Sequence, residues 1–252
     1  MSSTHPHCFL TALCIGAAFV LPLHADTVLE TETAELGKKG EITISNSVQF
    51  EKARDGTRTA FTLTQFEYGI TDRAEILIEP FFHEWSKAPG GPTIHGMGDL
   101  EITPSYMIVL DDEKGWRPAV VLAFKVKVPT ARNREIGTGL VDYYPYVIVG
   151  KKIGHWLFNA NLGIDFIGKN KDDTDTKNQL IYDFSIEREI TDKWSVFGEV
   201  FGNSRPAIGE RSTFSGAVAT EYKFTEHFNT FVSVGYDTDH LFNIRPGFNF
   251  VF

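Results

Sequence analysis

The last strand-like segment of the chain alternates apolar and polar side chains and ends on a terminal phenylalanine. One side of this alternation holds Phe242, Ile244, Phe248, Phe250 and Phe252. A period of two sends successive side chains to opposite faces of a β-strand. A last strand with one apolar and one polar face is typical of a bacterial outer-membrane β-barrel, whose lipid face must be apolar. The pattern predicts an all-β fold, an antiparallel up-and-down transmembrane β-barrel.

The terminal aromatic residues also resemble the signal that the outer-membrane assembly machinery reads. We assign this role to Phe248, Phe250 and Phe252. The sequence accordingly predicts a location in the outer membrane of a Gram-negative cell, after secretion across the inner membrane. The expected partners are the barrel assembly machinery, outer-membrane lipid and lipopolysaccharide, together with a small-molecule solute.

The N-terminus carries a short apolar run and, up to Ala25, no Asp, Glu, Lys or Arg. The run ends at Leu23-His24-Ala25, and the acidic Asp26 follows it. This arrangement predicts a signal peptide over residues 1–25, cleaved after Ala25. A retained membrane helix is the alternative, and it is disfavoured because the run falls short of the roughly 20 residues that a span needs.

Composition excludes several classes of protein. Both cysteines, Cys8 and Cys14, lie within the predicted signal, so the mature chain would have no disulfide, no thiolate zinc site and no cysteine nucleophile. The formal net charge is -9, without a basic block or a basic-aromatic patch, which argues against a nucleic-acid partner. No other segment is apolar enough for a membrane helix, which leaves a closed sheet as the way to satisfy the backbone in lipid.

Twelve strand-like segments follow a polar stretch at 26–39, which we expect to be a loosely ordered periplasmic leader. The barrel domain is predicted to cover residues 40–252. The expected strands lie near 41–50, 58–68, 73–82, 98–110, 116–128, 138–149, 155–167, 179–189, 193–202, 212–224, 227–236 and 242–252.

The links between these segments alternate in length. Short links such as 69–72 and 190–192 alternate with longer ones such as 83–97 and 168–178. Short periplasmic turns and longer external loops are typical of outer-membrane barrels. An even number of strands places both ends of the barrel in the periplasm.

Strand parity divides the side chains between a lipid face and a lumen face, although it is ambiguous at 58–68 and 138–149. A soluble lipocalin-like barrel or sandwich would show the same alternation with the faces reversed. The signal, the terminal phenylalanine and the link lengths favour the membrane barrel. The candidates for the lumen lining are Glu75, Glu79, Asp99, Glu101, Arg117, Lys125, Lys127, Asp165, Asp183, Glu187, Glu199, Glu221 and Arg245.

The two segments that flank the short link at 111–115 carry complementary charges. If this link is tight, Asp99 lies opposite Lys127 and Glu101 lies opposite Lys125 on the lumen face. The same register pairs two sets of lipid-face residues, Ile102 with Phe124 and Tyr106 with Val120. Opposed charges stabilise a ladder modestly. This cluster has two interpretations, a charged constriction that selects permeants or a network of ion pairs that fills and stiffens a small barrel.

Several segments resemble one outer-membrane family. They are ETAELGKKGEITI at 32–44, TQFEYGITDRAEI at 64–76, GMGDLEITPSYMI at 96–108, KVPT at 127–130 and GTGLVDYYP at 137–145. The family is named after the meta-pathway of phenol degradation, and its members are regarded as transporters. The resemblance implies a barrel whose gene neighbours in some bacteria degrade aromatic compounds. Uptake of small aromatic or hydrophobic solutes is implied at the family level, and no catalytic or ligand residue is carried over.

No motif predicts catalysis, a metal ion or a cofactor. The sequence DDTD at 172–175 lacks the glycine and the terminal glutamate of a calcium loop, and we interpret it as a hairpin tip. The sequence DTDH at 237–240 has an acid and a histidine like those of omptin proteases, but no second acidic pair completes it. Ser105, Ser185 and Ser195 lack the G-x-S-x-G context of a hydrolase.

Three functions remain open. The favoured one is a passive outer-membrane channel for small solutes, which works by diffusion and is not an enzyme. The second is a barrel hydrolase at the outer rim, for which the chain offers only the residues at 237–240. The third is a structural or adhesive barrel whose loop arginines contact lipopolysaccharide, namely Arg132, Arg134, Arg205 and Arg211.

Overall fold

The structure is a computed structural model that describes residues 28–252 except 113, 134, 170–175, 206 and 208–210, and leaves the side chains of 80–82 undescribed. The named regular elements of this part of the chain are all β-strands. Among the described residues, no helix is long and apolar enough to span a membrane. The predicted signal, with Cys8 and Cys14, and the DDTD sequence at 172–175 lie outside the described residues.

Thirteen strands belong to one antiparallel sheet, and the pairing of β2 with β3 closes that sheet into a barrel. The wall contains twelve of them, so the predicted fold class is confirmed. The strands are β1 (Ile42–Lys52), β2 (Arg58–Thr71), β3 (Ala74–Lys87), β4 (Thr93–Met97), β5 (Leu100–Val109), β6 (Ala119–Val128), β7 (Asp142–Ile153), β8 (Trp156–Asp165), β9 (Gln179–Thr191), β10 (Trp194–Asn203), β11 (Thr213–Thr225), β12 (Phe228–Asp237) and β13 (Phe242–Val251).

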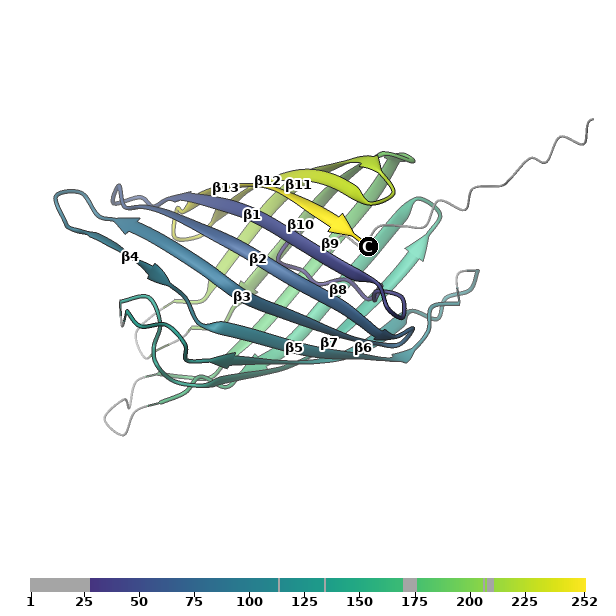
Figure 1. Cartoon of the computed structure of the whole chain (residues 1–252), viewed down its shortest axis with the longest axis horizontal. Helices are drawn as coiled ribbons and strands as arrows, with labels where there is room; N and C mark the ends of the chain where they lie inside the picture. The colour runs from purple at the N-terminus through teal and green to yellow at the C-terminus, as the bar shows by residue number, and fades with distance from the viewer. Residues whose placement is uncertain (1–27, 113, 134, 170–175, 206, 208–210) are drawn as a thin grey trace, which may run out of the picture.

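The additional strand, β4, pairs only with the outer end of β3, and β5 pairs with the rest of β3. It extends the wall where the sequence predicted a long loop at 83–97. Figure 1 shows β4 at the end of the barrel that carries the longer loops, whereas the C-terminus lies at the opposite end. We call these the long-loop end and the short-turn end.

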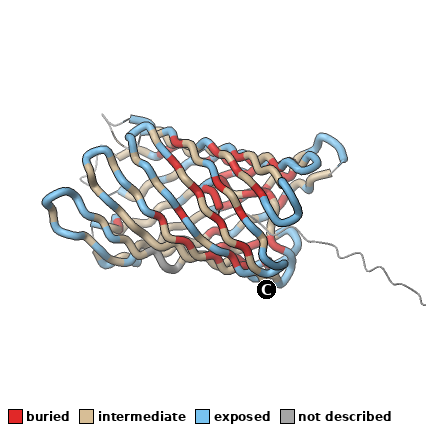
Figure 2. The backbone as a smooth tube through the Cα atoms, turned by 90° about the horizontal axis from the view of Figure 1, so that it is seen from above, coloured by how far each residue is buried: buried red, intermediate tan, exposed pale blue. Residues whose placement is uncertain are grey.

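Inward and outward side chains alternate along the strands as their parity predicts. On β13, Arg245 and Asn249 are buried, whereas Phe242, Phe248 and Phe250 are exposed on the outer wall. Figure 2 shows that buried positions follow the strands through the middle of the barrel, while the loops at one end are exposed. This arrangement places the apolar face against lipid, as a membrane barrel requires.

The structure also resolves the two strands of ambiguous parity. On β7, Tyr146 and Ile148 are buried inside the barrel, whereas Val147 and Val149 face outward. On β2, Glu67 is buried and Tyr68 is exposed, so the odd-numbered residues of this part of the strand face inward. The sequence left these faces open because consecutive aromatic or threonine residues interrupt the period of two.

The predicted register between β5 and β6 is wrong by two residues. Glu101 lies opposite Lys127 rather than Lys125, and Ile102 lies opposite Val126 rather than Phe124. A shift of two residues leaves the paired side chains of β5 and β6 on their predicted faces. Ion pairs therefore form diagonally, at 3.2 Å between Glu101 and Lys125 and at 4.0 Å between Asp99 and Lys127.

The cause of this shift is the connection between β5 and β6, which is longer than a tight turn. The carboxylate of Asp112 accepts hydrogen bonds from the backbone N–H groups of Gly115 and Arg117 at 3.0 and 3.2 Å. The side chain of Lys151 donates to Asp112 at 2.9 Å and lowers the pKa of this carboxyl. Pro118 has no N–H to donate to a ladder, and β6 begins at the next residue.

Arg117 is consequently not part of the lumen lining that the sequence predicted. It is exposed in the β5–β6 connection, and its Nε donates to the carbonyl of Leu110 at 3.1 Å. The sequence prediction extended β6 as far as Trp116, whose side chain is 90% exposed.

The described part of the expected leader, residues 28–39, is not a loosely ordered periplasmic segment. It lies inside the barrel, where Val28, Thr31 and Ala34 are each no more than 2% exposed. Its C-terminal end reaches the short-turn end, where the N–H of Gly40 donates to the carbonyl of Gly69 at 2.7 Å. We call residues 28–40 the lumen segment.

The two faces of β11 provide a matched test of this arrangement. Val218 is 62% exposed on the outer wall, and its neighbour Ala217 faces inward. If Val218 lies near the bilayer midplane, we expect Val218→Lys to lower the free energy of unfolding by about 2–4 kcal/mol, because lipid cannot solvate an ammonium group. Ala217→Lys should cost less, since water and carboxylates are available in the lumen. Urea titration of the refolded protein in phospholipid vesicles measures both, and a larger loss for Ala217→Lys would contradict the assigned faces.

Candidate functional site

The lumen segment is anchored on one side by Glu199 of β10 and Arg245 of β13. The Glu199 carboxylate accepts hydrogen bonds from the N–H groups of Glu30 and Thr31 at 3.1 Å each, and from the Thr31 hydroxyl at 2.9 Å. The Arg245 guanidinium donates to the carboxylate of Glu30 and to the carbonyl of Val28, both at 3.0 Å. These charge-assisted bonds satisfy backbone groups that would otherwise be unpaired inside the barrel.

On the other side, the segment is held by β7 and β8. The Tyr146 hydroxyl donates to the carboxylate of Glu32. The Asn161 amide, oriented to satisfy both groups, donates to the carbonyl of Glu32 at 3.0 Å and accepts from its N–H at 2.7 Å. Asn159 accepts from the N–H of Ala34 at 3.1 Å. The segment thus spans the lumen from the β10–β13 wall to the β7–β8 wall.

Apolar contacts complete the fit of the lumen segment. Val28 and Leu29 pack against Phe197, Ala219 and Phe231. Further along, Ala34 packs into a buried apolar cluster on the inner wall, which consists of Met107, Ala119, Val121, Ala123, Tyr146 and Ile148. The lumen face beneath the segment therefore includes two apolar clusters beside its polar anchors, although strand parity alone predicted a largely polar lining.

The turn back to β1 passes very close to the wall at Gly69 of β2. A Cβ atom on Gly69 would lie 2.0 Å from the carbonyl oxygen of Lys38, a distance that no side chain can occupy. Nearby, the N–H of Gly37 donates to the Glu75 carboxylate at 2.6 Å. The lumen segment can therefore take this position only because residue 69 of β2 is a glycine, which has no side chain.

The lumen segment separates two cavities. The outer cavity, of about 300 Å³, lies toward the long-loop end and is lined by Glu30 and Glu32 of the segment and by residues of β6–β11. The inner cavity, of about 680 Å³, lies toward the short-turn end and is lined by Ala34, Glu35 and Leu36 of the segment. A third cavity of about 200 Å³ lies beside the segment, against β2, β3, β5 and β6.

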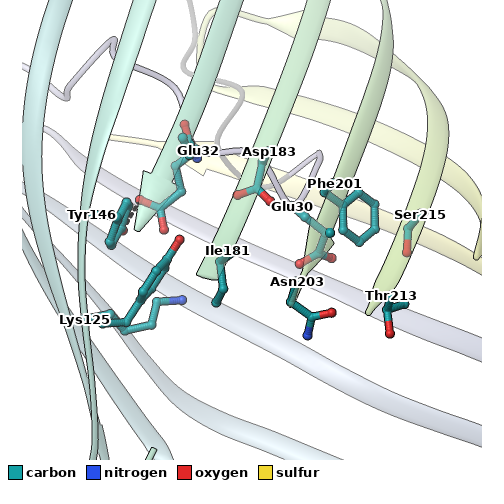
Figure 3. A pocket seen from close by; sticks show the side chains of 13 residues that line it. Glu30, Glu32, Lys125, Tyr146, Ile181, Asp183, Phe201, Asn203, Thr213 and Ser215 are labelled. Carbon is teal, nitrogen blue, oxygen red and sulfur yellow. Dashed lines mark hydrogen bonds between the residues drawn. The ribbon is translucent and has the colours of Figure 1, made fainter. Parts of the chain in front are cut away.

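Three adjacent strands present a regular patch to the outer cavity. Asp183 of β9 lies opposite Phe201 of β10, and Phe201 lies opposite Ser215 of β11. Figure 3 shows Asp183 and Glu30 directed into the same space, with Tyr146 and Lys125 on the facing side. The pairing of consecutive strands therefore brings together residues that are far apart in the sequence.

The structure places the other predicted lumen residues on the inward side of the wall. Lys125 forms ion pairs with Glu79 at 3.4 Å and with Glu101, while Lys127 pairs with Asp99 and Asp142. Buried or partly buried inward positions also hold Glu75, Asp165, Asp183, Glu187, Glu199, Glu221 and Arg245. Whether these residues line a permeation path stays a prediction.

Sequence reasoning missed the residues of the lumen segment and the tyrosines of β7. Glu30 and Glu32 were assigned to a solvated leader because the segment is polar. Tyr144 and Tyr146 were not assigned to a face because the YYPY sequence obscures the parity. One sequence feature could have indicated that the segment is buried and hydrogen-bonded. It is rich in threonine and glutamate, whose side chains form hydrogen bonds readily.

The DTDH sequence forms a turn between β12 and β13. The Asp237 carboxylate accepts from the N–H groups of Asp239 and Leu241, at 2.8 Å each. His240 has a positive φ of 64°, and its Nδ1 is 2.6 Å from the Tyr236 hydroxyl. Asp237 therefore stabilises the turn, and the described contacts of the His240 ring do not include a carboxylate. Within the described residues, no cluster of three His, Cys, Asp or Glu could hold a metal ion.

A comparison with models of known protein families shows to which family the chain belongs. A family model described as "Putative MetA-pathway of phenol degradation" matches residues 40–249. The chain belongs to this family. The predicted resemblance is thereby confirmed over the barrel domain, and most of the lumen segment precedes the match. The comparison with curated proteins gives no match.

Solved outer-membrane proteins of this family's fold include two porins and an autotransporter domain. The NanC porin matches with a TM-score of 0.61 and 13% identity, over 82% of this chain and 98% of the porin. The KdgM porin in complex with disordered oligogalacturonate gives 0.55 and 10%, with the same coverage of 82% and 98%. The translocator domain of the autotransporter NalP from Neisseria meningitidis gives 0.51 and 8%, over 85% and 88%. Identities this low establish the fold alone.

If Glu199 anchors the lumen segment, then removal of its carboxylate should make the backbone amides of the segment exchange faster with deuterium. Glu199→Ala removes the acceptor of two backbone N–H groups and one hydroxyl, so we expect the amides of residues 28–34 to exchange at least about tenfold faster with deuterium. The matched control is Asp165→Ala on β8, because no hydrogen bond or ion pair among the described residues joins Asp165 to the segment. Hydrogen–deuterium exchange followed by mass spectrometry measures both variants. Unchanged protection in Glu199→Ala would show that this carboxylate does not hold the segment.

Proposed function

We propose that the chain is an outer-membrane channel through which small solutes diffuse down a concentration gradient, without a cofactor and without catalysis. One observation carries the proposal: a closed barrel with a charged interior has cavities on both sides of the lumen segment and a third cavity beside it. Water and polar solutes can occupy such an interior, whereas the outer wall is apolar. The short-turn end, where the C-terminal phenylalanine lies, would face the periplasm.

The lumen segment would set the size limit of the channel. It contacts β3, β7, β8, β10 and β13, so it crosses most of the cross-section. Solutes would pass through the cavity beside it, lined by Leu63 and Gln65 of β2 and by Glu101 and Lys125 of the ion-pair cluster. This geometry favours small molecules over oligomers. Small aromatic or hydrophobic compounds, which the family's name suggests, are within this range.

The charge of the lumen would favour cations and neutral molecules over anions. Lys125 is shared by two carboxylates, Glu79 and Glu101. Glu75 and Glu199, both buried, accept hydrogen bonds from the lumen segment. Carboxylates on the inner wall thus outnumber the cations that neutralise them, and rings of acidic side chains select cations in channels.

The alternatives have less support. A rim hydrolase would require His240 to act with a carboxylate, whereas Asp237 accepts bonds from the backbone of its own turn. A structural or adhesive barrel would use loop arginines such as Arg132, Arg205 and Arg211, which require no particular lumen geometry. The contacts of the lumen segment and the three cavities are better explained by passage through the barrel.

Planar-bilayer recording of the refolded chain tests the proposal directly. We expect a small conductance with a reversal potential that favours cations in a KCl gradient, because the lumen is acidic. Glu101→Lys should shift the reversal potential in the direction of anion selectivity, since it replaces an acid of the ion-pair cluster by a base. Asp239→Lys, the same change of charge in a loop outside the lumen, is the control. A chain without conductance under any of these conditions, or a potential that Glu101→Lys does not move, would refute the channel or its selectivity.

Gly69 provides a test of the size limit that leaves the charges unchanged. Gly69→Ala places a methyl group where the Lys38 carbonyl lies, so we expect the lumen segment to be displaced and the single-channel conductance to rise at least about twofold. Gly198→Ala is the control, because a Cβ there would meet its nearest neighbour at 3.8 Å. Equal conductances in the two variants would mean that the segment does not restrict flow.

A further inference from the structure

We propose that the outer cavity binds a small organic cation that carries an aromatic or apolar group, such as a protonated arylalkylamine. The inference rests on the proposed channel for its biological role, because it names the solute class that the lumen would take up. The binding site itself is argued from the walls, the polar groups and the charge balance of the cavity. Its volume of about 300 Å³ is at the lower end of the range for small-molecule sites.

The first observation is an aromatic and apolar wall. The rings of Tyr144 and Tyr146 stack with their centroids 4.5 Å apart and an interplanar angle of 11°. Gly163 of β8 makes room for them, because a Cβ there would lie 2.5 Å from the Tyr144 ring. Ile181 and Phe201 line the same cavity. Such surfaces bind an aromatic ring by burial of apolar area and attract a cation through the ring quadrupole.

The second observation is a set of inward polar side chains without a partner. Asp183, Asn203 and Ser215 line the cavity, and within the described part of the chain their side chains form no hydrogen bond or ion pair. Ser215 is only 7% exposed, so its hydroxyl has little access to solvent other than through the cavity. Buried polar groups are almost always hydrogen-bonded. The buried Ser215 hydroxyl therefore points to a ligand, or to water that a ligand would replace, and the half-buried Asp183 and Asn203 on the two preceding strands offer further polar atoms to it.

The third observation is the charge balance. Lys125 reaches the cavity but is already shared by Glu79 and Glu101. Glu30 is paired with Arg245 at 3.0 Å. Asp183, by contrast, forms no ion pair among the described residues, and Glu32 accepts a hydrogen bond from the neutral Tyr146 hydroxyl. Lys125 acts on both carboxylates only from beyond ion-pair distance.

A protonated amine satisfies these conditions better than a neutral or anionic ligand. An ammonium group has three donors and no acceptor, so it could donate to the Asp183 carboxylate, which faces the cavity without an ion-pair partner among the described residues. Charge-assisted bonds of this kind are stronger than those to a neutral hydroxyl. An anion would instead approach Asp183 and Glu32 with repulsion on both sides, in an interior where charges are poorly screened.

Isothermal titration of residues 26–252 in zwitterionic detergent tests the proposal, with detergent micelles alone as the blank. The ligands are phenethylamine, 2-phenylethanol and phenylacetate, which share a phenyl group and differ in charge. We expect phenethylamine to bind at least about tenfold more tightly than 2-phenylethanol, and phenylacetate to bind most weakly. Asp183→Asn should lower the affinity for phenethylamine about tenfold and leave that for 2-phenylethanol unchanged.

Asp165→Asn is the matched control, because this carboxylate lies on the neighbouring β8 but does not line the outer cavity. Circular dichroism confirms that each variant is folded. Phe201→Leu, which keeps the charges, should weaken phenethylamine and 2-phenylethanol alike. Equal affinities for the three ligands, tightest binding of phenylacetate, an unchanged affinity in Asp183→Asn or the absence of binding would each overturn the proposal. Because binding needs no current, a barrel that binds the amine without conducting would refute the channel and keep the site.

Discussion

The structure depends on one constraint, that the backbone of a chain in lipid must form all its hydrogen bonds internally. A closed sheet meets it, and here β1 pairs with β13 and β2 pairs with β3, so that no strand edge of the wall is left open. Closure divides the side chains into an outer and an inner set with a period of two. The outer set can be almost uniformly apolar, which leaves the inner set free to carry charge.

The same need for internal hydrogen bonds applies to backbone groups inside the barrel. The lumen segment brings backbone N–H groups into the barrel, where each needs an acceptor. Glu199, Glu75 and Asn159 supply these acceptors from three different strands. The burial of two acids in the wall, Glu75 and Glu199, is thus explained by the segment that they hold, and these acids add to the negative charge of the interior. The position of the segment and the charge of the lumen are therefore two consequences of one set of contacts.

The sequence predicts the strands of the barrel wall far better than it predicts the segment and the cavities inside the barrel. The strands and their faces follow from local alternation, so Phe248 and Arg245 could be placed on opposite sides without a structure. The β5–β6 register was wrong because the bonds of Asp112 in the connection are not visible as a pattern. The lumen segment was misjudged because a polar sequence is usually solvated, and because its anchors Glu199, Asn159 and Arg245 lie more than a hundred residues away. The tyrosines beside the outer cavity were missed because adjacent aromatic residues hide the parity of β7.

The size limit for neutral solutes tests the central claim, that the chain's own N-terminal segment narrows the lumen. Liposomes that contain either residues 26–252 or a variant lacking residues before 38 would be compared in swelling assays with sugars of increasing size. The account predicts that the shortened chain admits larger sugars than residues 26–252, with the barrel folded in both. The same limit for both proteins would contradict it.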